Sequence, residues 1–468
     1  MPSTVNFDSI TSSDLHHADS QGYVGKYGNG LSEDLVRKIS AEKSESAWVL
    51  KLRLESLKKF YELPIPSFGP DLADLDLEKI CYYATATDQN NKKSWDEVPS
   101  EIKQTFERLK IPEAERAVLA GVGAQYDSEN VYHRLKDEWC SKGVIFEDFD
   151  VAIREHGEKV REYFSRVISL TDHKFAALHY AIFSGGTFLY VPEGVTVSQP
   201  LQAYFRMNAR RGGQFEHTLI IVEKNASVEY IEGCSAPKFG AASLHAGGVE
   251  VVIKEGARCR YSSVENWSPD TYNLNTKRAV VHQNARMEWI GGNLGSGRTM
   301  LYPCSLLVGK KARAEHLGVA FANGDQNQDT GAKIFISAPD CRASVISKSL
   351  SKNGGITTYR GMVDVNKSAE NAIVTVECDA LMLDDKSVSD TIPTIRLHNN
   401  SAQVNHEACA GKISAETLQY FASRGIDEET AKGIIVNGFL NEIVKTLPLE
   451  YASELNRLIE LEMEGSVG

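Results

Sequence analysis

Val222-Glu-Lys-Asn-Ala226-Ser-Val228 is a turn between two apolar segments, and the pattern returns as Ile253-Lys-Glu-Gly-Ala257-Arg-Cys259 and Val281-His-Gln-Asn-Ala285-Arg-Met287. Four further copies follow, and a small residue marks each one. The markers are Ala226, Ala257, Ala285, Ala312, Cys341, Ala369 and Ala402, at intervals of 31, 28, 27, 29, 28 and 33 residues. A strand-rich unit repeated at this period buries its apolar face only by stacking on its neighbours. The pattern predicts a β-solenoid, with a large β-sandwich of accidental spacing as the alternative.

The residues around these markers are typical of corners between strands. Between Val249 and Lys254, apolar residues alternate with charged ones, which gives a strand one buried face and one solvated face. We therefore expect a mainly β core at residues 181–410, built as a stack of coils. Four of the seven residues before a marker tolerate positive φ at little cost, namely Asn225, Gly256, Asn284 and Asp340.

The overall composition is that of an ordinary soluble protein. The chain has 468 residues, enough for two or three domains, and a net charge of −12 with a pI near 5.6. The excess of acidic residues argues against nucleic-acid binding. The sequence has no apolar run long enough to span a membrane, and its polar N-terminal residues do not resemble a signal peptide. We expect no nucleic acid and no membrane among the partners, and a cytoplasmic location in which the eight cysteines are reduced.

Helical patterns flank the repeats on both sides. Residues 1–30 lack periodicity and are expected to be poorly ordered. Residues 31–180 are predicted to form an N-terminal helical domain that starts at the N-cap Ser32 and includes helices at 132–139 and 151–164. Residues 411–468 are predicted to form a C-terminal domain of three helices. Its apolar stripe packs either on the solenoid's end or on another protein, and consists of Ile434, Ile435, Phe439, Ile443 and Leu447.

Familiar enzyme motifs are absent from the sequence. It contains no G-x-S-x-G, no Walker A and no Rossmann glycine motif. Any ATP chemistry must therefore belong to a partner, and we expect a non-enzymatic protein. One alternative is a carbohydrate-processing enzyme, which needs carboxylates and basic residues in an exposed groove. The other is a structural adaptor whose thiols only pack in the core.

One thiol lies about a repeat away from a His-Glu pair. His406 and Glu407 follow Cys378 by 28 and 29 residues, so the three side chains can sit on neighbouring coils about 5 Å apart. Thiolate, imidazole and carboxylate suit iron or zinc, and three mixed ligands leave an open, labile position. A core thiol is the alternative for Cys378, and Cys409 is either a further soft ligand or a neighbour.

A second thiol occupies a similar place at the other end of the stack. Cys234 follows Ala226 by eight residues, and Cys378 follows Ala369 by nine. If each repeat adds one coil, the two thiols lie five intervals and about 24 Å apart. A thiol at each end suggests transfer between them.

These residues stand in stretches that resemble the SufB/SufD family of the Suf iron–sulfur assembly machinery, and its SufB branch in particular. The resemblance covers about residues 31–468. The stretches that carry it include Ile111–Arg116, Ala124–Glu129, Ser184–Gly186, Tyr204–Asn208, Gly213–Glu216, Tyr230–Pro237, Asn266–Trp267, Tyr272–Leu274, Thr276–Arg278, Gln328–Lys333, Glu377–Asp379, His406–Ala408, Val436–Phe439 and Glu464–Gly468.

The resemblance implies a right-handed parallel β-helix between helical domains, and a scaffold on which iron–sulfur clusters are assembled. Sulfur from a cysteine desulfurase and a sulfur-transfer protein is expected at Cys234. The transient cluster, expected as 4Fe-4S, is expected near Cys378 with Glu407 and His406 as further ligands, before it passes to apo iron–sulfur proteins. An internal route between the two ends is expected along Arg206, Asn208, Glu265, Trp267 and Lys277, with Lys277 and Arg206 favouring thiolate or persulfide charge.

The implied partners are two copies of a SufC-type ABC ATPase, docked on the terminal helices, and a SufD-type paralogue or a second copy of this chain. Three features depart from some family members. Glu265 stands where some have Gln, and Asn405 where some have Glu. The Cys-rich N-terminal motif of certain members is missing, so no cluster is expected in residues 60–100.

Overall fold

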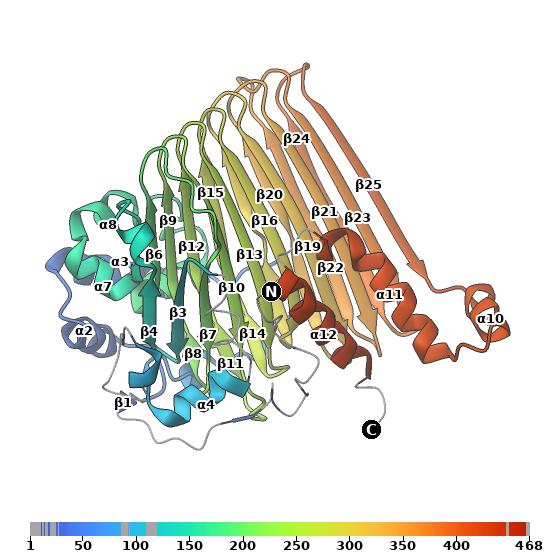
Figure 1. The fold of residues 1–468 in the computed structure, drawn as a ribbon, viewed down its shortest axis with the longest axis horizontal. Coiled ribbons are helices and arrows are strands. Elements are labelled where there is room, and N and C mark those ends of the chain that lie inside the picture. The colour runs from blue at the N-terminus through green and yellow to red at the C-terminus, as the bar shows by residue number, and fades with distance from the viewer. Residues whose placement is uncertain are drawn as a thin grey trace.

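The structure is a computed structural model that describes residues 11, 14, 17–18, 25–26, 28–85, 92, 94–108, 119–445 and 449–464. The expectation of poor order for residues 1–30 falls mainly outside these residues. Figure 1 shows long strands stacked side by side along one axis, with the N-terminal helices at one end of the stack and the C-terminal helices across the face near the other.

Two sheets of stacked strands form the core, which confirms the mainly β solenoid. The first sheet contains, in spatial order, β25 (Gln403–Lys412), β23 (Ile373–Met382), β21 (Arg342–Lys352), β19 (Arg313–Asn323), β16 (Arg286–Gly295), β13 (Arg258–Trp267), β10 (Ser227–Ser235), β7 (Leu201–Arg206), β3 (Gly121–Tyr126) and β4 (Glu129–Leu135). The second sheet contains β5 (Ile145–Asp148), β6 (Gly186–Val191), β9 (His217–Val222), β12 (Gly248–Ile253), β15 (Thr276–Val281), β18 (Cys304–Leu307), β20 (Asn327–Ile336), β22 (Ile356–Val365) and β24 (Val388–Leu397).

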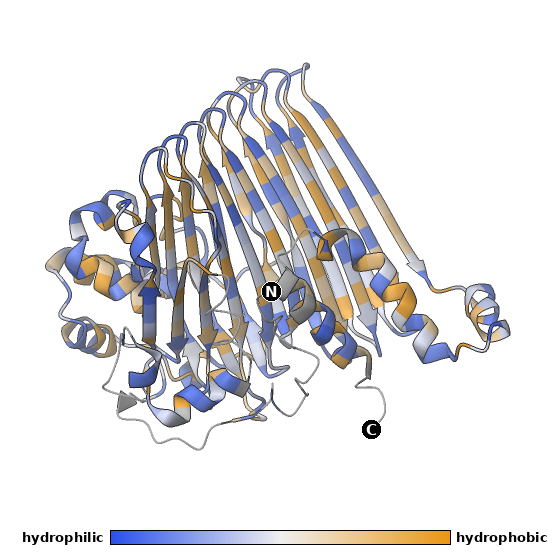
Figure 2. Cartoon of the chain, viewed as in Figure 1, coloured by the Kyte–Doolittle hydropathy of each residue, from blue (hydrophilic) through white to orange (hydrophobic). Residues whose placement is uncertain are grey.

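Four short strands continue the second sheet beside β20, and a separate two-stranded sheet lies near the N-terminus. The short strands are β17 (Arg298–Leu301), β14 (Thr271–Asn273), β11 (Ser243–His245) and β8 (Gly213–Gln214), and the small sheet joins β1 (Gly25–Lys26) to β2 (Ala84–Thr85). Within the two large sheets pairing is parallel, except where β3 meets β4 and β5 meets β6. Each coil therefore adds one strand to the first sheet and either one long strand or two short strands to the second. Equivalent residues form rows along the axis, visible as hydropathy bands across the strands (Figure 2).

The predicted corners lie between the strands of successive sheets. Asn225, Gly256, Asn284 and Asp340 all have positive φ, between 54° and 68°, as does Lys311 at 62°. Backbone in this region costs Asn and Gly little, which is why these residue types recur at the corner. The repeat pattern thus identified the points at which the chain turns.

The sixth marker was placed on the wrong residue. Register pairs Arg342 with Ile373, so the residue equivalent to Cys341 is Ala372 rather than Ala369, and the positive φ of this corner belongs to Asn371, at 56°. The turn over residues 366–372 is longer than the turn over 337–341, and spacing alone does not reveal where the extra residues lie. With Ala372 as the marker, the last two intervals become 31 and 30 residues.

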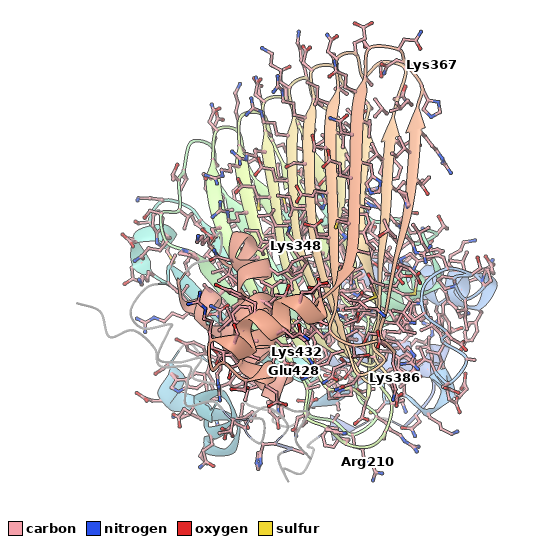
Figure 3. All side chains as sticks on the ribbon, turned by 90° about the vertical axis from the view of Figure 1, so that its right-hand side faces the viewer. Arg210, Lys348, Lys367, Lys386, Glu428 and Lys432 are labelled. Carbon is pink, nitrogen blue, oxygen red and sulfur yellow. The ribbon has the colours of Figure 1, made fainter. Side chains whose placement is uncertain are left out.

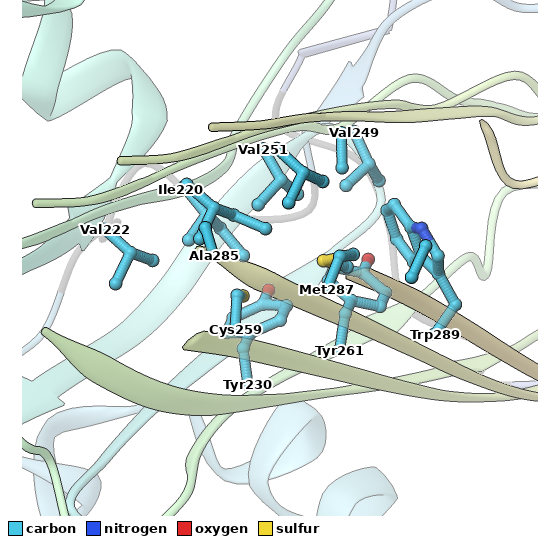
Figure 4. Close-up of a cluster of buried hydrophobic side chains, with 14 of the residues drawn as sticks. Ile220, Val222, Tyr230, Val249, Val251, Cys259, Tyr261, Ala285, Met287 and Trp289 are labelled. Carbon is cyan, nitrogen blue, oxygen red and sulfur yellow. The ribbon is translucent and has the colours of Figure 1, made fainter. Parts of the chain in front are cut away.

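The two sheets face each other across a packed interior, which we call the lumen. In Figure 4, Val249 and Val251 of the second sheet face Tyr261, Met287 and Trp289 of the first. All five side chains are at most 3% exposed. Burial of the inward residues of every coil supplies the main stabilising free energy, at roughly 25 cal/mol per Å² of apolar surface.

Helices of the N-terminal half pack around the early coils. They are α2 (Glu33–Glu42), α3 (Ala47–Glu62), α4 (Ser100–Arg108), α6 (Asp137–Cys140), α7 (Phe149–Glu155), α8 (Gly157–Tyr163) and α9 (Lys174–Ile182), with the 3₁₀ turns η2 (Leu77–Lys79) and η3 (Trp95–Glu97). Ser32 caps α2 as expected, its side chain accepting from the Leu35 N–H. The helices α2, α3 and α9 pack on the second sheet, whereas α4 packs on β3 and β7 of the first.

Strand structure begins earlier than the sequence pattern indicated. The helix expected at 132–139 is wrong for most of its length, because β4 runs from Glu129 to Leu135 and only Asp137–Cys140 is helical. The strand pairs with β3, which itself pairs with β7, so the stack extends back to Gly121. Strand pairing with residues distant in the sequence therefore outweighed the helical spacing of the apolar residues in this segment.

The C-terminal helices pack on the outer face of the first sheet. They are α10 (Ala415–Ser423), α11 (Glu428–Val444) and α12 (Leu449–Glu464), and Figure 1 shows α11 and α12 across the strands while α10 projects beyond them. Val436, Leu440 and Ile443 of α11 are buried against the sheet, while Ile434 is 47% exposed. The predicted stripe therefore lies on this helix, apart from Leu447, which falls outside the described residues, and only part of the stripe forms the buried face.

Candidate functional site

Cys234 lies on the lumen face of the first sheet, in an early coil. On β10 it pairs in register with Phe205 of β7 and Glu265 of β13, and its side chain is 1% exposed. Residues in register share a face of the sheet, so the thiol and the Glu265 carboxylate face the same interior. Glu232, two residues earlier on β10, faces the lumen as well.

A buried charge network fills the lumen beside Cys234. Lys277, on β15 of the opposite sheet, places Nζ 2.6 Å from Glu265 Oε1 and 3.1 Å from Glu232 Oε1, and all three side chains are 1% exposed. The Tyr261 hydroxyl donates to the other Glu232 oxygen at 2.5 Å. Burial by itself lowers the pKa of Lys277, but the two carboxylates outweigh it and raise that pKa above its ordinary value. Lys277 is therefore a fixed cation that joins the two sheets.

The network continues through an amide and an imidazole. Asn273 Nδ2 donates to Glu265 Oε2 at 2.7 Å, and the two nitrogens of His245 lie 2.8 Å from Asn273 Oδ1 and 2.6 Å from Glu216 Oε1. The Trp267 ring lies over His245, with centroids 4.3 Å apart. Burial alone raises the pKa of Glu265, but Lys277 and His245 bring it below its ordinary value, so this residue is an anion.

The thiol of Cys234 is held in its neutral form. Burial raises its pKa well above the ordinary value, Glu232, Glu265 and Glu216 raise it further, and Lys277 opposes them. The expected influence of Lys277 on a thiolate thus has the predicted direction, but the desolvation and the three carboxylates outweigh it. At neutral pH Cys234 is a thiol rather than a thiolate.

Arg206 and Asn208 lie outside the lumen. Arg206 pairs in register with Ser235, one residue beyond Cys234, so strand alternation directs it to the outer face of the first sheet. There Nη1 donates to Ser235 Oγ at 3.0 Å and Nη2 to the carbonyl of His17 at 2.7 Å. Asn208 follows the end of β7, where its N–H donates to Asp127 Oδ1 at 2.6 Å. Of the five expected route residues, the structure places Glu265, Trp267 and Lys277 along the lumen.

Cys378 also faces the lumen, five strand spacings along the same sheet from Cys234. It is 4% exposed on β23, and its Sγ lies 3.6 Å from Nε2 of His406 on β25. The ring of Tyr359 stacks near His406, with centroids 6.5 Å apart. Burial raises the pKa of Cys378 to about 12, while a hydrogen bond from the Tyr359 hydroxyl acts in the opposite direction. The structure thus places His406 beside Cys378, as expected, and shows that Tyr359 also lies beside them.

Glu407 lies on the other face of the sheet. It pairs in register with Glu377, whereas Cys378 pairs with Ala408, so alternation along β25 separates the carboxylate from the thiol. In the part of the chain that the structure describes, no group of three or more His, Cys, Asp and Glu side chains could hold a metal ion. Both β25 and β24 are terminal strands that pair on one side only, so this end of the solenoid is an open edge.

The outer face behind Cys378 is tied to the C-terminal helices. Lys348 of β21 forms ion pairs with Asp379 and, at 3.6 Å, with Glu377, the two sequence neighbours of the thiol. Its Nζ also lies 5.3 Å from the ring centroid of Phe439 on α11. Figure 3 shows Lys348 beside these helices, far from Lys367 at the corner end of the strands. A displacement of α11 therefore bears on the strand that carries Cys378.

Sequence reasoning missed several residues of the network. The position of Glu232 could have been predicted from the sequence, because a residue two positions before a lumen-facing cysteine on a strand faces the lumen too. His245 and Asn273 carried no such signal, since they come from short strands whose alignment depends on the neighbouring coils, and Glu216 lies between β8 and β9. Tyr359 lies in the opposite sheet from Cys378, and only the closure of the coil brings them together.

Comparison with known proteins gives consistent matches along the chain. A family model described as "SUF system FeS cluster assembly, SufBD core domain" matches residues 205–439, and one described as "SufBD protein N-terminal region" matches residues 37–203. The chain is 50% identical, over 439 residues covering 94% of each chain, to the iron-sulfur cluster assembly protein SufB of Bacillus subtilis (strain 168). Iron-sulfur cluster assembly SufBD family proteins of Staphylococcus epidermidis (strain ATCC 12228) and Staphylococcus aureus (strain MRSA252) match with the same identity and coverage.

Proposed function

The chain belongs to the SufBD family of iron–sulfur cluster assembly proteins, and from this premise we propose that it is the non-enzymatic scaffold on which the cluster forms. Its role in cluster assembly follows from the family. The observation that carries the scaffold proposal is the pair of lumen-facing thiols, Cys234 and Cys378, on one sheet and separated by five strand spacings, about 24 Å. Sulfur enters at the first thiol, and the cluster is built at the second.

The charge network beside Cys234 supports its assignment as the sulfur acceptor. A thiolate is the nucleophile in sulfur exchange, so Cys234 must lose a proton when the donor arrives. Lys277 lies in the same network and stabilises the charge that remains on a thiolate or persulfide. Arg206 is buried on the opposite face, where it fixes β7 to β10 through Ser235, and it contributes to the site by positioning that strand.

The open edge supports a releasable cluster site at Cys378 and His406. A cluster held by four thiolates is hard to empty, whereas one thiolate with nitrogen and oxygen ligands binds weakly. Two protein ligands from this chain leave the site incomplete, and a paralogue or second copy docked on the edge strands would complete it. Glu407 joins this ligand set only if β25, which pairs on one side, changes its alignment with β23.

The remaining partners follow from the same proposal. An ABC-type ATPase supplies nucleotide hydrolysis, which the motif-free sequence does not, and docks on the C-terminal helices, where Tyr420 and Ile434 are 58% and 47% exposed. A desulfurase with its sulfur-transfer protein delivers sulfur, and apo iron–sulfur proteins accept the finished cluster, expected as 4Fe-4S, in the cytoplasm. None of the helices in the described part of the chain combines the length and apolar composition that a membrane crossing requires.

Replacing Cys378 by Ser is expected to abolish the cluster. The measurement is the visible absorption of the complex with its ATPase and paralogue, purified without oxygen after co-expression. Wild type should show a sulfide-to-iron charge-transfer band, and the variant should lack it at equal yield of complex, because serine removes the thiolate ligand.

The matched control is Cys341→Ser, a buried thiol at a corner of the solenoid that should keep the band. A normal band in Cys378→Ser would move the cluster to other ligands. No band in wild type would favour the adaptor function over the scaffold.

His406→Ala should weaken the band more than Glu407→Ala if both sheets keep the alignment described here.

A further inference from the structure

Direct sulfur transfer between Cys234 and Cys378 is prevented by distance. Exchange between thiols requires contact between the sulfur atoms, but these two lie five strand spacings, about 24 Å, apart. Two other thiols line the lumen core, Cys259 and Cys341, and both lie at the corner end of their strands, about 13 Å or more along the strand from the rows of the two thiols. A chain of thiols therefore does not bridge the interval.

A cavity lies in the interval instead. The row that ends at Cys378 runs back through Ser347, Gly318, Gly291 and Ser263 to Glu232. These four intermediate residues line a cavity of about 60 Å³ that extends from Lys277 to Tyr359, the residue hydrogen-bonded to the Cys378 thiol. A cavity of this size holds a few molecules as small as water.

Packing does not require glycine at these positions. A Cβ on Gly318 would meet no atom within 4 Å, and one on Gly291 would meet only Ser263 Oγ, at 3.8 Å. Neither residue has positive φ. Glycine in a strand interior is destabilising unless something approaches closely, so the open space in this row is not explained by the fold.

A buried donor without a partner lines the cavity. His316 is 4% exposed, and its Nδ1 has no hydrogen-bond partner among the described residues. The indole N–H of Trp289 donates to Ser305 Oγ at 3.2 Å, and Ser305 Oγ lies 2.9 Å from His316 Nε2. When the serine hydroxyl donates its one proton to Nε2, that nitrogen is an acceptor and the imidazole proton is on Nδ1. Burial lowers the pKa of His316 to about 3, so the ring is neutral.

We propose that this cavity is a holding site for hydrogen sulfide on its way from Cys234 to Cys378, with the Nδ1–H of His316 donating a hydrogen bond to its sulfur. The inference rests on the proposed scaffold function and names the form in which sulfur crosses the lumen. Neutral hydrogen sulfide suits the walls better than its anion, because Leu301, Pro303 and Val345 are apolar and the cation of Lys277 in the lining is already paired with Glu232 and Glu265.

The release step is balanced by a thiol reductant. The persulfide of Cys234 and two thiols give the Cys234 thiol, one hydrogen sulfide and one disulfide. The sulfur–sulfur bond of the persulfide breaks and that of the disulfide forms. Of the three hydrogens, one stays on Cys234 and two leave on the sulfide. No atom of the cavity wall takes part in this chemistry.

Two variants test the proposal in the complete complex. Gly318→Val fills the cavity from a strand position where valine is favoured, and His316→Phe keeps most of the ring volume but removes the donor. Ser344→Val, on the outer face of the neighbouring strand, is the matched control. Each complex receives iron and sulfur in two ways, either through the desulfurase with labelled cysteine and a thiol, or as sodium sulfide added directly.

We expect Gly318→Val to acquire label on Cys234 as wild type does, to form no cluster by the desulfurase route, and to form a normal cluster with sodium sulfide at the open edge. His316→Phe should slow the desulfurase route about two- to tenfold, the effect of one hydrogen bond. Thermal unfolding of each variant confirms that it is folded. Equal cluster formation by the desulfurase route in both variants and wild type would overturn the cavity proposal. Failure of wild type to label Cys234 would instead overturn the scaffold function.

Discussion

Replacing Lys277 by Met is expected to lower the free energy of unfolding by about 3–5 kcal/mol, the effect of removing one partner from a buried ion pair. Lys277 Nζ lies 2.6 Å and 3.1 Å from carboxylate oxygens of Glu265 and Glu232, and all three side chains are 1% exposed. Methionine fills a similar volume but leaves two carboxylates in the lumen without their cation. Urea denaturation followed by circular dichroism measures the loss.

Two further variants separate the charge effect from packing. Glu232→Gln and Glu265→Gln together with Lys277→Met remove the whole charge set, and this triple variant should recover most of the lost stability, since a neutral core of similar volume is often as stable as the ion pairs. Lys310→Met removes an exposed pair with Asp340, at 3.6 Å, and should change stability by less than about 1 kcal/mol. If Lys277→Met is as stable as Lys310→Met, the two carboxylates are not both charged in the folded protein.

Gly295→Ala is expected to cost more than about 4 kcal/mol, or to prevent folding, because both its conformation and its space are restricted to glycine. Gly295 ends β16 at a φ of 84°, and a Cβ there would lie 1.9 Å from the backbone oxygen of Trp267. The backbone of the preceding coil would have to move, and it carries the Trp267 ring of the lumen network. Thermal unfolding and the yield of soluble protein measure the effect.

Gly291→Ala on the same strand is the control. It has ordinary φ and a nearest atom at 3.8 Å, so alanine there should change stability by less than about 1 kcal/mol. A similar, small loss for both variants would mean that the coils can separate at Gly295 without breaking their pairing.

The lumen of this solenoid differs from an ordinary apolar core in a way that fits transport. Its corner end is packed with aliphatic and aromatic side chains, as Figure 4 shows around Cys259 and Met287. Its other end holds ion pairs, buried histidines and a cavity between two thiols. Charged groups in a core cost stability unless each is paired, and here they are concentrated beside the thiol proposed to receive sulfur.

Much of the fold could be predicted from local sequence. The period of the markers, the corner residues with positive φ and the alternation of the strands are properties of short segments, and they identified the solenoid and its axis. They also placed Cys234 and Cys378 in the same sheet, five coils apart. The error at residues 132–139 arose where strand pairing with distant residues overrode a local helical pattern.

The face on which a residue lies was decided by tertiary structure. A shift of one residue in register places every side chain of a strand on the opposite face of the sheet. Because the turn at 366–372 is longer than expected, His406 lies on the same face as the Cys378 thiol and Glu407 lies on the other face. In the same way, Arg206 lies on the outer face of the first sheet, whereas Cys234 lies on its lumen face. The pairing of Lys277 with Glu232 and Glu265 needed both sheets to close around the lumen. Sequence thus determined the coils and the thiols, and the packing of one coil on the next determined their partners, because register and closure depend on contacts between residues far apart in the chain.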